Sequence, residues 1–245
     1  MISVVCVYND KATLDSLLLA SLARQDAAFD LTCLDNTSGQ YACAATALNE
    51  AGRGAANDIV MFVHQDVELL SPMWLADAER MVRSLGPGAT AGVGGVDDRG
   101  RGWSSVWSGN PRRVAGGHSP TSPTAVQTLD GCLVIVFQDA FTTTRFDADT
   151  CSGWHLYVAD YCLSRRRSGH TSFVLPLPVY HRSMGPAANV LQDTANAIVR
   201  KHVAHSPRIV TTVGELTPIS APRRLWARAR KVLGRLRTRW HPVAP

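Results

Sequence analysis

Two motifs that mark large classes of nucleotide-binding protein are missing from this sequence. No Gly-x-Gly-x-x-Gly follows the first strand-like segment, and no Gly-x-x-x-x-Gly-Lys-Ser/Thr occurs anywhere in the 245 residues. A Rossmann dehydrogenase and a P-loop enzyme are therefore disfavoured. The segment after the first predicted strand, residues 8–11, is not glycine-rich and carries no arginine, which argues against a sugar-phosphate nucleotidyltransferase.

Closely spaced cysteines and long apolar runs are missing too. None of the six cysteines forms a Cys-x-x-Cys pair, so the sequence argues against zinc and favours reduced, mostly buried thiols. No apolar run approaches the roughly 20 residues that a membrane span needs. The apolar segment 2–8 has no basic region before it and is too short for a signal peptide. These absences predict a cytoplasmic protein.

Acidic residues are missing from one part of the chain. Residues 216–245 contain eight basic and no acidic side chains, whereas residues 1–215 contain 17 basic and 20 acidic ones. The length suits one large α/β domain, so we expect a domain over 1–215 and a basic tail over 216–245. Apolar residues of the tail recur at helical spacing and predict an amphipathic helix. They are Leu225, Trp226, Ala229, Val232, Leu233, Leu236 and Trp240.

A basic amphipathic helix with two tryptophans is typical of a segment that lies in a membrane interface. We therefore expect the tail to bind an anionic membrane surface and to hold the protein at the inner face of the cell membrane. Docking of the same helix on the acidic body is the alternative. Nucleic acid is not an expected partner, because no recognition module accompanies the charge.

Residues 58–66 are the segment around which the predicted fold is organised. Ile59 to Val63 are apolar without a helical period, which is typical of a buried strand in a parallel sheet. His64-Gln65-Asp66 follows directly, so the chain must reach the surface at the carboxyl end of the strand. Ligands bind at this edge of open α/β sheets, and a carboxylate beside an imidazole suits a divalent cation or a phosphorylated ligand. A plain polar turn is the alternative.

The order of elements predicts the fold class. Strands at 2–7, 29–34 and 59–63 alternate with helices at about 11–22 and 41–51, which indicates a mostly parallel, Rossmann-like α/β sheet flanked by helices. The polar ends of the three strands should meet in a nucleotide-sized cleft. The rest of the body is expected as a helix at 72–84, a strand at 89–96, a long surface loop at 97–123, a strand at 132–137, a helix at 155–168 and a proline-broken edge strand at 173–179.

Several motifs, in order, resemble those of family 2 glycosyltransferases, which have the GT-A nucleotide-sugar-binding fold. The resemblance covers residues 1–190, and it is greatest to the small group whose acidic motif reads His-Gln-Asp in place of Asp-x-Asp. The matching segments are Tyr8-Asn9-Asp10, Phe62-Val63-His64-Gln65-Asp66, Phe146-Asp147, Gly153-Trp154-His155-Leu156-Tyr157 with Asp160, and His181-Arg182-Ser183.

The resemblance implies a role for each matching residue. Asp66 and His181 would hold Mn²⁺ or Mg²⁺ on the diphosphate of a nucleotide sugar, and Asp160 would be the catalytic base of an inverting transfer. The acceptor, which would be a glycan, a lipid-linked or a small-molecule hydroxyl, would contact Trp103, Trp154 and His155. The donor would contact Tyr8, Asn9, Asp10, Asp35, Asn36, His64 and Gln65.

These roles agree with the chemistry of sugar transfer. The acceptor hydroxyl must lose its proton as it attacks, and a nearby carboxylate can accept that proton. The leaving nucleoside diphosphate develops charge, which a cation with carboxylate and imidazole ligands can stabilise. A histidine ligand favours Mn²⁺ slightly over Mg²⁺.

Each role also has a structural alternative. Asp160 could be a surface acid of its helix, His155 and His181 could be structural histidines, and the tryptophans could pack in the core or in a lid. Because His64 replaces an acid of the usual motif, a catalytically inactive relative that only binds nucleotide or glycan as a scaffold is the second hypothesis. Turnover of a nucleotide sugar separates the two.

Overall fold

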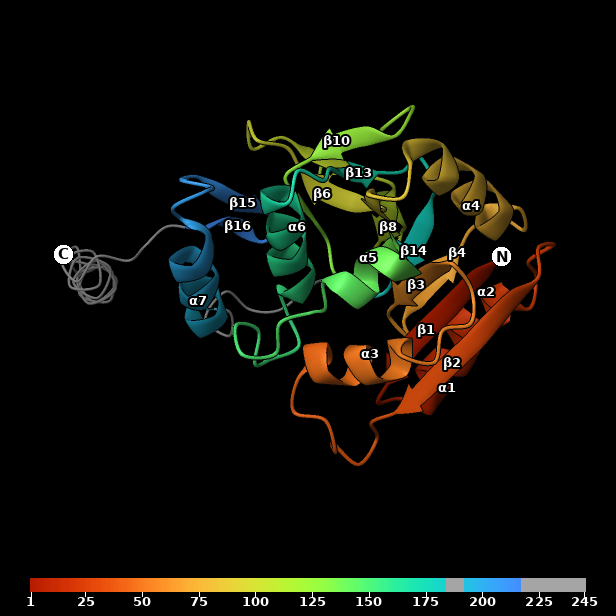
Figure 1. Ribbon diagram of the computed structural model, residues 1–245. Helices are drawn as coiled ribbons and strands as arrows, with labels where there is room; N and C mark the ends of the chain where they lie inside the picture. Colours follow the sequence, from red (N-terminus) through yellow and green to blue (C-terminus); the bar gives the residue numbers. More distant parts are fainter. Residues whose placement is uncertain (184–191, 217–245) are drawn as a thin grey trace, which may run out of the picture.

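The computed structural model describes residues 1–183 and 192–216, which form a mixed α/β structure around one large sheet (Figure 1). Apart from Leu216, the predicted basic helix over 216–245 lies outside the described residues. Among those that are described, no helix is both long enough and apolar enough to cross a bilayer. Five of the six cysteines are buried, as expected, and Cys33 is exposed.

The first three strands form as the sequence predicts. β1 lies between β2 and β3 and is parallel to both, so their carboxyl ends lie at the same edge of the sheet. Helical segments make both connections. The elements are β1 (Ile2–Tyr8), α1 (Lys11–Leu14), the π-helical turn η1 (Asp15–Leu19), α2 (Ala20–Leu22), β2 (Phe29–Asp35), α3 (Ala44–Gly52) and β3 (Ile59–Val63).

The large sheet has seven strands in the order β10-β13-β5-β12-β3-β1-β2. β12 (Leu133–Phe137) is antiparallel to β3, with Leu133 opposite Val63. The amino end of β12 therefore lies at the edge where β3 ends. β10 is antiparallel to its neighbour β13, so β10 and β12 run opposite to the rest of the sheet. The other five strands, β1, β2, β3, β5 and β13, share one direction, and the sheet is mostly parallel as expected. The remaining strands are β5 (Thr90–Gly92), β10 (Thr124–Val126) and β13 (Ser172–Val174), and β13 is not an edge strand.

Smaller sheets lie beside the large one, and they correct the expected surface loop over 97–123. Three short strands lie within that segment. The small sheets have the orders β11-β6-β7, β4-β14-β8-β9 and β15-β16. Their strands are β4 (Val67–Leu69), β6 (Gly94–Val96), β7 (Gly102–Ser104), β8 (Val106–Ser108), β9 (Arg113–Val114), β11 (Thr128–Leu129), β14 (Val179–His181), β15 (Ile209–Thr211) and β16 (Gly214–Leu216).

Helices cover both faces of the large sheet (Figure 1). Alternate residues of a strand point to opposite faces, so Val4 and Met61 pack on one face while Val5 and Phe62 pack on the other. The first face is covered by η1, α2 and α4 (Trp74–Leu85). The second is covered by α3, α5 (Gln138–Thr143), α6 (Tyr157–Arg167) and α7 (Gln192–His202). The polar strand ends are left open at one edge.

Candidate active site

The carboxyl ends of β1, β2 and β3 open into one cavity of about 1110 Å³. Residues from β6, β7 and β8 and from the tip of the β15–β16 hairpin complete its wall. Most of the predicted site residues line the cavity. They are Tyr8, Asn9, Asn36, His64, Gln65, Asp66, Trp103, Trp154, His155 and His181. Three predicted carboxylates, Asp10, Asp35 and Asp160, are not part of the lining.

Asp10 and Asp35 each make local hydrogen bonds, and their predicted contact with the donor stays a prediction. Asp10 is the N-cap of α1, where its Oδ1 accepts a hydrogen bond of 3.1 Å from the backbone N of Thr13. Asp35 accepts a 2.7 Å bond from the backbone N of Thr37, which shapes the turn after β2. The nearby Asp35 carboxylate raises the pKa of the Tyr8 phenol, and Tyr8 lines the cavity.

Gln65 supports the first strand end. Its Oε1 accepts bonds from the backbone N of Asn9 at 2.8 Å and of Asp10 at 3.0 Å. Its Nε2 donates to Asn9 Oδ1 at 2.7 Å. The predicted donor residue Gln65 therefore holds Asn9 in place, which joins the end of β3 to the end of β1.

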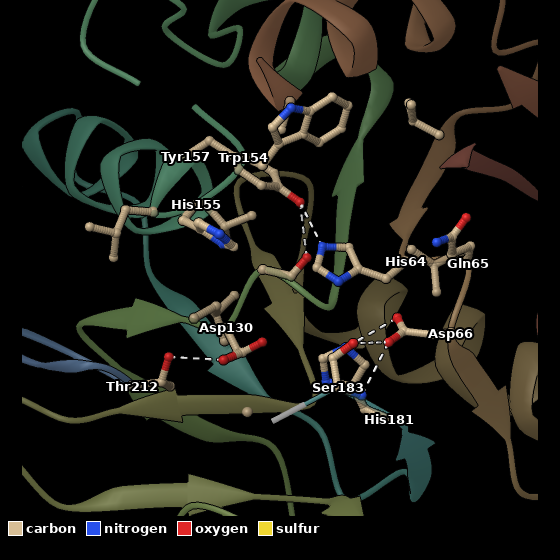
Figure 2. Close-up of a pocket in the computed structure, with 18 of the residues that line it drawn as sticks. His64, Gln65, Asp66, Asp130, Trp154, His155, Tyr157, His181, Ser183 and Thr212 are labelled. Carbon is tan, nitrogen blue, oxygen red and sulfur yellow. Dashed lines mark hydrogen bonds and ion pairs between the residues drawn. The ribbon is translucent and has the colours of Figure 1, made fainter. Parts of the chain in front are cut away.

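His64, Asp66 and His181 form a cluster in the cavity. One possible ligand atom from each residue lies within 4.8 Å of the others. His181 Nε2 lies 3.2 Å from Asp66 Oδ1 but, although it is buried, makes no well-directed hydrogen bond to any residue that the structure describes. The backbone N and the hydroxyl of Ser183 donate to the other oxygen, Asp66 Oδ2 (Figure 2). His64 and Asp66 follow directly after β3. The antiparallel pairing of β14 with β4 places His181 opposite Val67 and so brings it beside them.

The protonation of this cluster follows from its surroundings. Burial lowers the pKa of His64 to about 4, so its imidazole is neutral at physiological pH. Burial alone would raise the pKa of Asp66, but the interaction with His181 outweighs it and leaves the carboxylate ionised. The same pair raises the pKa of His181, against the effect of its burial. An anionic carboxylate and a neutral imidazole are the forms that bind metal ions.

Tyr157 fixes the orientation of His64. Its hydroxyl donates to Gly131 O at 3.0 Å and lies 3.3 Å from His64 Nε2. A tyrosine has a single O–H proton, so the phenol oxygen accepts from Nε2–H of the histidine. This tautomer leaves the Nδ1 lone pair of His64 for a cation.

Asp130 is a second carboxylate in the cavity, and the sequence analysis missed it. Its Oδ1 accepts from the backbone N of Cys132 at 2.9 Å, and its Oδ2 accepts from Thr212 Oγ1 at 2.9 Å (Figure 2). Burial raises the pKa of Asp130, but these hydrogen bonds and nearby His181 outweigh burial and hold it below its usual value. Asp66 and Asp130 are the only carboxylates among the described residues that line the cavity.

No protein-family model matches the sequence, and no curated protein matches it either. Solved structures do match. S. aureus TarS 1–349 is 16% identical, with 84% of this chain and 68% of that chain covered and a TM-score of 0.58. GalNAc-T7 with UDP, GalNAc and Mn²⁺ is 11% identical, with 82% and 48% covered and a TM-score of 0.57. The mannosyltransferase PcManGT from Pyrobaculum calidifontis, with GDP-Man and Mn²⁺, is 17% identical, with 84% and 64% covered and a TM-score of 0.51.

This chain has the GT-A fold. The structural matches and the mixed sheet flanked by helices together establish the predicted fold class. At these identities the matches describe the fold only, so the roles of individual residues in this GT-A chain depend on their own geometry.

Asp160, the predicted catalytic base, does not line the cavity. It is 1% exposed, and its two oxygens accept from Lys201 Nζ at 2.7 Å and His202 Nε2 at 2.8 Å. Lys201 also bonds Asp147 Oδ2 at 2.8 Å, so the cluster joins α6 to α7 and to the preceding loop. Because Asp160 is almost completely buried and lies outside the cavity lining, an acceptor in the cavity cannot reach it, and its predicted catalytic role is corrected to a structural one.

The acceptor residues that the sequence predicted do line the GT-A cavity. Trp154 is 37% exposed, and Trp103 is half-buried with its Nε1 donating to Asp97 Oδ2 at 3.3 Å. Burial lowers the pKa of His155, which keeps its ring neutral. Aromatic faces and a neutral imidazole at the wall of the cavity suit the apolar faces and hydroxyl groups of sugars.

Proposed function

We propose that this chain is a nucleotide-sugar-dependent glycosyltransferase of the hexosyltransferase type, which transfers a sugar to a hydroxyl group with inversion at the anomeric carbon. One observation carries the proposal: a single cavity contains polar strand ends, the His64–Asp66–His181 cluster and the separate carboxylate of Asp130. They match the three needs of the reaction, which are nucleotide binding, neutralisation of a diphosphate and a base. The GT-A fold and the motifs that resemble the His-Gln-Asp group of family 2 support it.

The nucleotide of the donor is proposed to lie against the ends of β1 and β2. Tyr8, Asn9 and Asn36 line this part of the cavity, and the turn 37–39 adds backbone groups and small side chains. Asn36 Nδ2 donates to Tyr41 O, and Asn36 Oδ1 accepts from Tyr41 N. These two hydrogen bonds hold the turn in shape. Solved GT-A structures with UDP-GlcNAc or GDP-Man support a nucleotide sugar as the ligand class.

The residues present fit a divalent cation. The ligand atoms of His64, Asp66 and His181 converge within 4.8 Å, and the buried Nε2 of His181 makes no well-directed hydrogen bond within the described residues. When bound, Mn²⁺ or Mg²⁺ would neutralise the diphosphate and stabilise the leaving nucleoside diphosphate. Two imidazoles beside one carboxylate favour Mn²⁺ over Mg²⁺.

Asp130 is proposed as the base that removes the proton of the acceptor hydroxyl. Its carboxylate faces the cavity and is ionised at neutral pH, because two hydrogen bonds hold its pKa below the usual value. As the acceptor oxygen bonds the anomeric carbon, Asp130 takes the proton, and the electron pair of the broken glycosyl–oxygen bond stays with the nucleoside diphosphate. A single displacement of this kind inverts the anomeric centre.

The acceptor is proposed to lie against Trp103, Trp154 and His155 and to be a glycan, a lipid-linked or a small-molecule hydroxyl. Binding of residues 216–245 to an anionic surface would bring a membrane-embedded acceptor to the cavity. This proposal also keeps the protein at the inner face of the cell membrane, with a role in building cell-envelope glycans.

A screen of nucleotide sugars tests the proposal. Thermal shift with MnCl₂ present identifies donors that bind, and release of nucleoside diphosphate from each binding donor measures turnover. We expect at least one nucleotide sugar to raise the Tm and to be consumed, with activity lost in EDTA and restored by Mn²⁺. Binding without turnover with any acceptor class would favour the inactive scaffold. Full activity in EDTA would overturn the proposed cation site.

A further inference from the structure

The tip of the β15–β16 hairpin reaches the cavity from a distant part of the chain. Thr211, Thr212 and Val213 all line the cavity. Asp130, which Thr212 contacts there, lies about 80 residues earlier in the chain, just before strand β12. The Thr212 side chain is directed at the Asp130 carboxylate (Figure 2). The hairpin therefore contributes to the wall of the cavity on the side of Asp130, away from the strand ends proposed to bind nucleotide.

The hairpin is fixed to the body by directed hydrogen bonds. Gln127 Oε1 accepts from the backbone N of Val210 at 2.8 Å, and Gln127 Nε2 donates to Arg208 O at 3.0 Å. Thr128 Oγ1 donates to Val210 O at 2.6 Å. Ile209 and Val210 are buried, which adds apolar packing to these bonds. A strand clamped in this way presents its tip in one position.

The tip itself is a tight turn. Thr211 Oγ1 donates to Gly214 O at 2.8 Å, and Gly214 has φ +123°, a conformation that favours glycine. Thr212 lies between these two anchors and is exposed. Its hydroxyl is therefore available to the cavity, while its backbone is held.

The Asp130 carboxylate depends on Thr212 for its second anchor. Oδ1 is held by the backbone N of Cys132, and Oδ2 is held by the Thr212 hydroxyl. The torsion about the Cβ–Cγ bond of an aspartate is broad, so one hydrogen bond alone leaves the plane of the carboxylate free to rotate. Each carboxylate oxygen has two lone-pair sites, so Oδ2 can accept from Thr212 and still accept a second proton.

We propose that Thr212 is a positioning residue, whose hydroxyl holds the Asp130 carboxylate in the orientation that receives the proton of the acceptor hydroxyl. The inference rests on the proposed function, because it assigns Thr212 to the same transfer. It makes the β15–β16 hairpin part of the acceptor side of the site. Thr212 touches Asp130 and acts only through it.

The test compares two variants with a control after the donor has been identified. Thr212→Val keeps the β-branched shape and removes the hydroxyl, and Thr212→Ser keeps the hydroxyl. Thr124→Val is the control, since Thr124 on β10 donates its hydroxyl to Ser122 O and does not line the cavity. We expect Thr212→Val to lower kcat about tenfold to a hundredfold with an unchanged KM for the donor, the loss expected for a hydrogen bond to a charged group. Thr212→Ser and Thr124→Val should stay within about threefold of the wild type.

A double-mutant cycle decides whether Thr212 acts through Asp130. In an Asp130→Asn background, Thr212→Val should have no further effect on kcat, because the carboxylate that it positions is gone. Circular dichroism and thermal unfolding show whether each variant is folded, and Thr212→Ala replaces the valine variant if that one is not. Equal kcat for wild type and Thr212→Val, or additive losses in the cycle, would overturn the inference while leaving the proposed function intact. A wild-type protein that turns over no nucleotide sugar would overturn both.

Discussion

At the scale of single residues, Asp130 and Asp160 offer a matched pair of carboxylates with opposite expected behaviour. Asp130→Asn keeps the shape but removes the proton acceptor, so we expect kcat to fall at least about a hundredfold with donor affinity little changed. Asp160→Asn breaks a buried pair with Lys201 and His202, so the free energy of unfolding should fall by about 3 kcal/mol.

Steady-state kinetics and urea denaturation of the two variants measure both effects. Isothermal titration with the donor separates a loss of binding from a loss of turnover. Normal turnover by a folded Asp130→Asn variant would remove Asp130 from the mechanism. Loss of turnover by a fully stable Asp160→Asn variant would return the base to the residue that the motif suggested.

His64 gives the metal-free protein a stability that depends on pH. The pKa is about 4 in the folded state, against about 6.5 for an exposed histidine, so the unfolded state binds more protons between these values. The free energy of unfolding therefore falls as the pH drops from about 6.5 towards 4. The raised pKa of His181 acts in a different window, since its stabilisation is complete below about 6.5 and is lost as the pH rises above that value.

Urea denaturation in EDTA at pH 7 and pH 5 tests this dependence. Relative to His64→Gln, the wild type should lose about 1–3 kcal/mol between the two pH values. The glutamine variant is the reference for the wild type because it lacks only the imidazole of His64 and retains His181 and every carboxylate. Equal pH slopes for the two proteins would show that the imidazole of His64 is not desolvated as the structure indicates.

At the scale of elements, the end of α3 packs unusually closely on the second face of the large sheet. A Cβ atom at Gly52 would lie 2.8 Å from a ring carbon of Phe141 and 2.9 Å from ring carbons of Phe62. Both rings are buried and lie 4.7 Å apart between centroids, so neither can move away easily. Gly52→Ala should therefore cost about 1–3 kcal/mol of stability.

Gly54→Ala is the matched control for this prediction. Gly54 lies two residues further on, and nothing would lie within 4 Å of an added Cβ there. Its free energy of unfolding should equal that of the wild type or exceed it slightly, because alanine restricts the unfolded chain. Equal stability of the Gly52 and Gly54 variants would mean that the rings yield to the added methyl group.

The elements that the sequence predicted are those with strong local signals. β1 is nearly all apolar and β3 entirely so, and polar residues at their ends line the cavity as expected. The strands within 97–123 were missed because they are two or three residues long and lie in a segment rich in Gly and Ser. The β15–β16 hairpin depends on Gln127 and Thr128, which are about 80 residues away in sequence.

The same distinction explains the two errors at the site. Asp130 precedes a buried strand, and only the antiparallel direction of β12 brings that end of the strand to the ligand edge. Local sequence does not record the direction of a strand. Asp160 lies in a motif-like segment, but Lys201 and His202 occupy its oxygens from a helix about 40 residues later. Pairings over such distances depend on tertiary structure alone.

At the scale of the whole molecule, the charge of the tail and the place where it leaves the body favour the same arrangement at a membrane. Residues 1–215 carry a small negative net charge, and residues 216–245 carry eight basic side chains with no acid. The described chain ends at Leu216 on β16, directly after the hairpin tip that lines the cavity. A tail that binds a membrane would therefore hold the acceptor side of the cavity close to the bilayer.

Liposome co-sedimentation tests this arrangement with the full chain and a version ending at Ser220, which keeps the hairpin. Each basic residue near an anionic leaflet contributes about 1 kcal/mol, so the full chain should pellet with anionic liposomes at low salt. Binding should weaken as salt rises, because screening shortens the range of the attraction to about 10 Å at 0.1 M. Neutral liposomes are the control for apolar adsorption. If both chains pellet equally, or neither pellets with anionic liposomes, the tail does not anchor the protein, and docking of residues 216–245 on the acidic body becomes the better interpretation of the charge asymmetry.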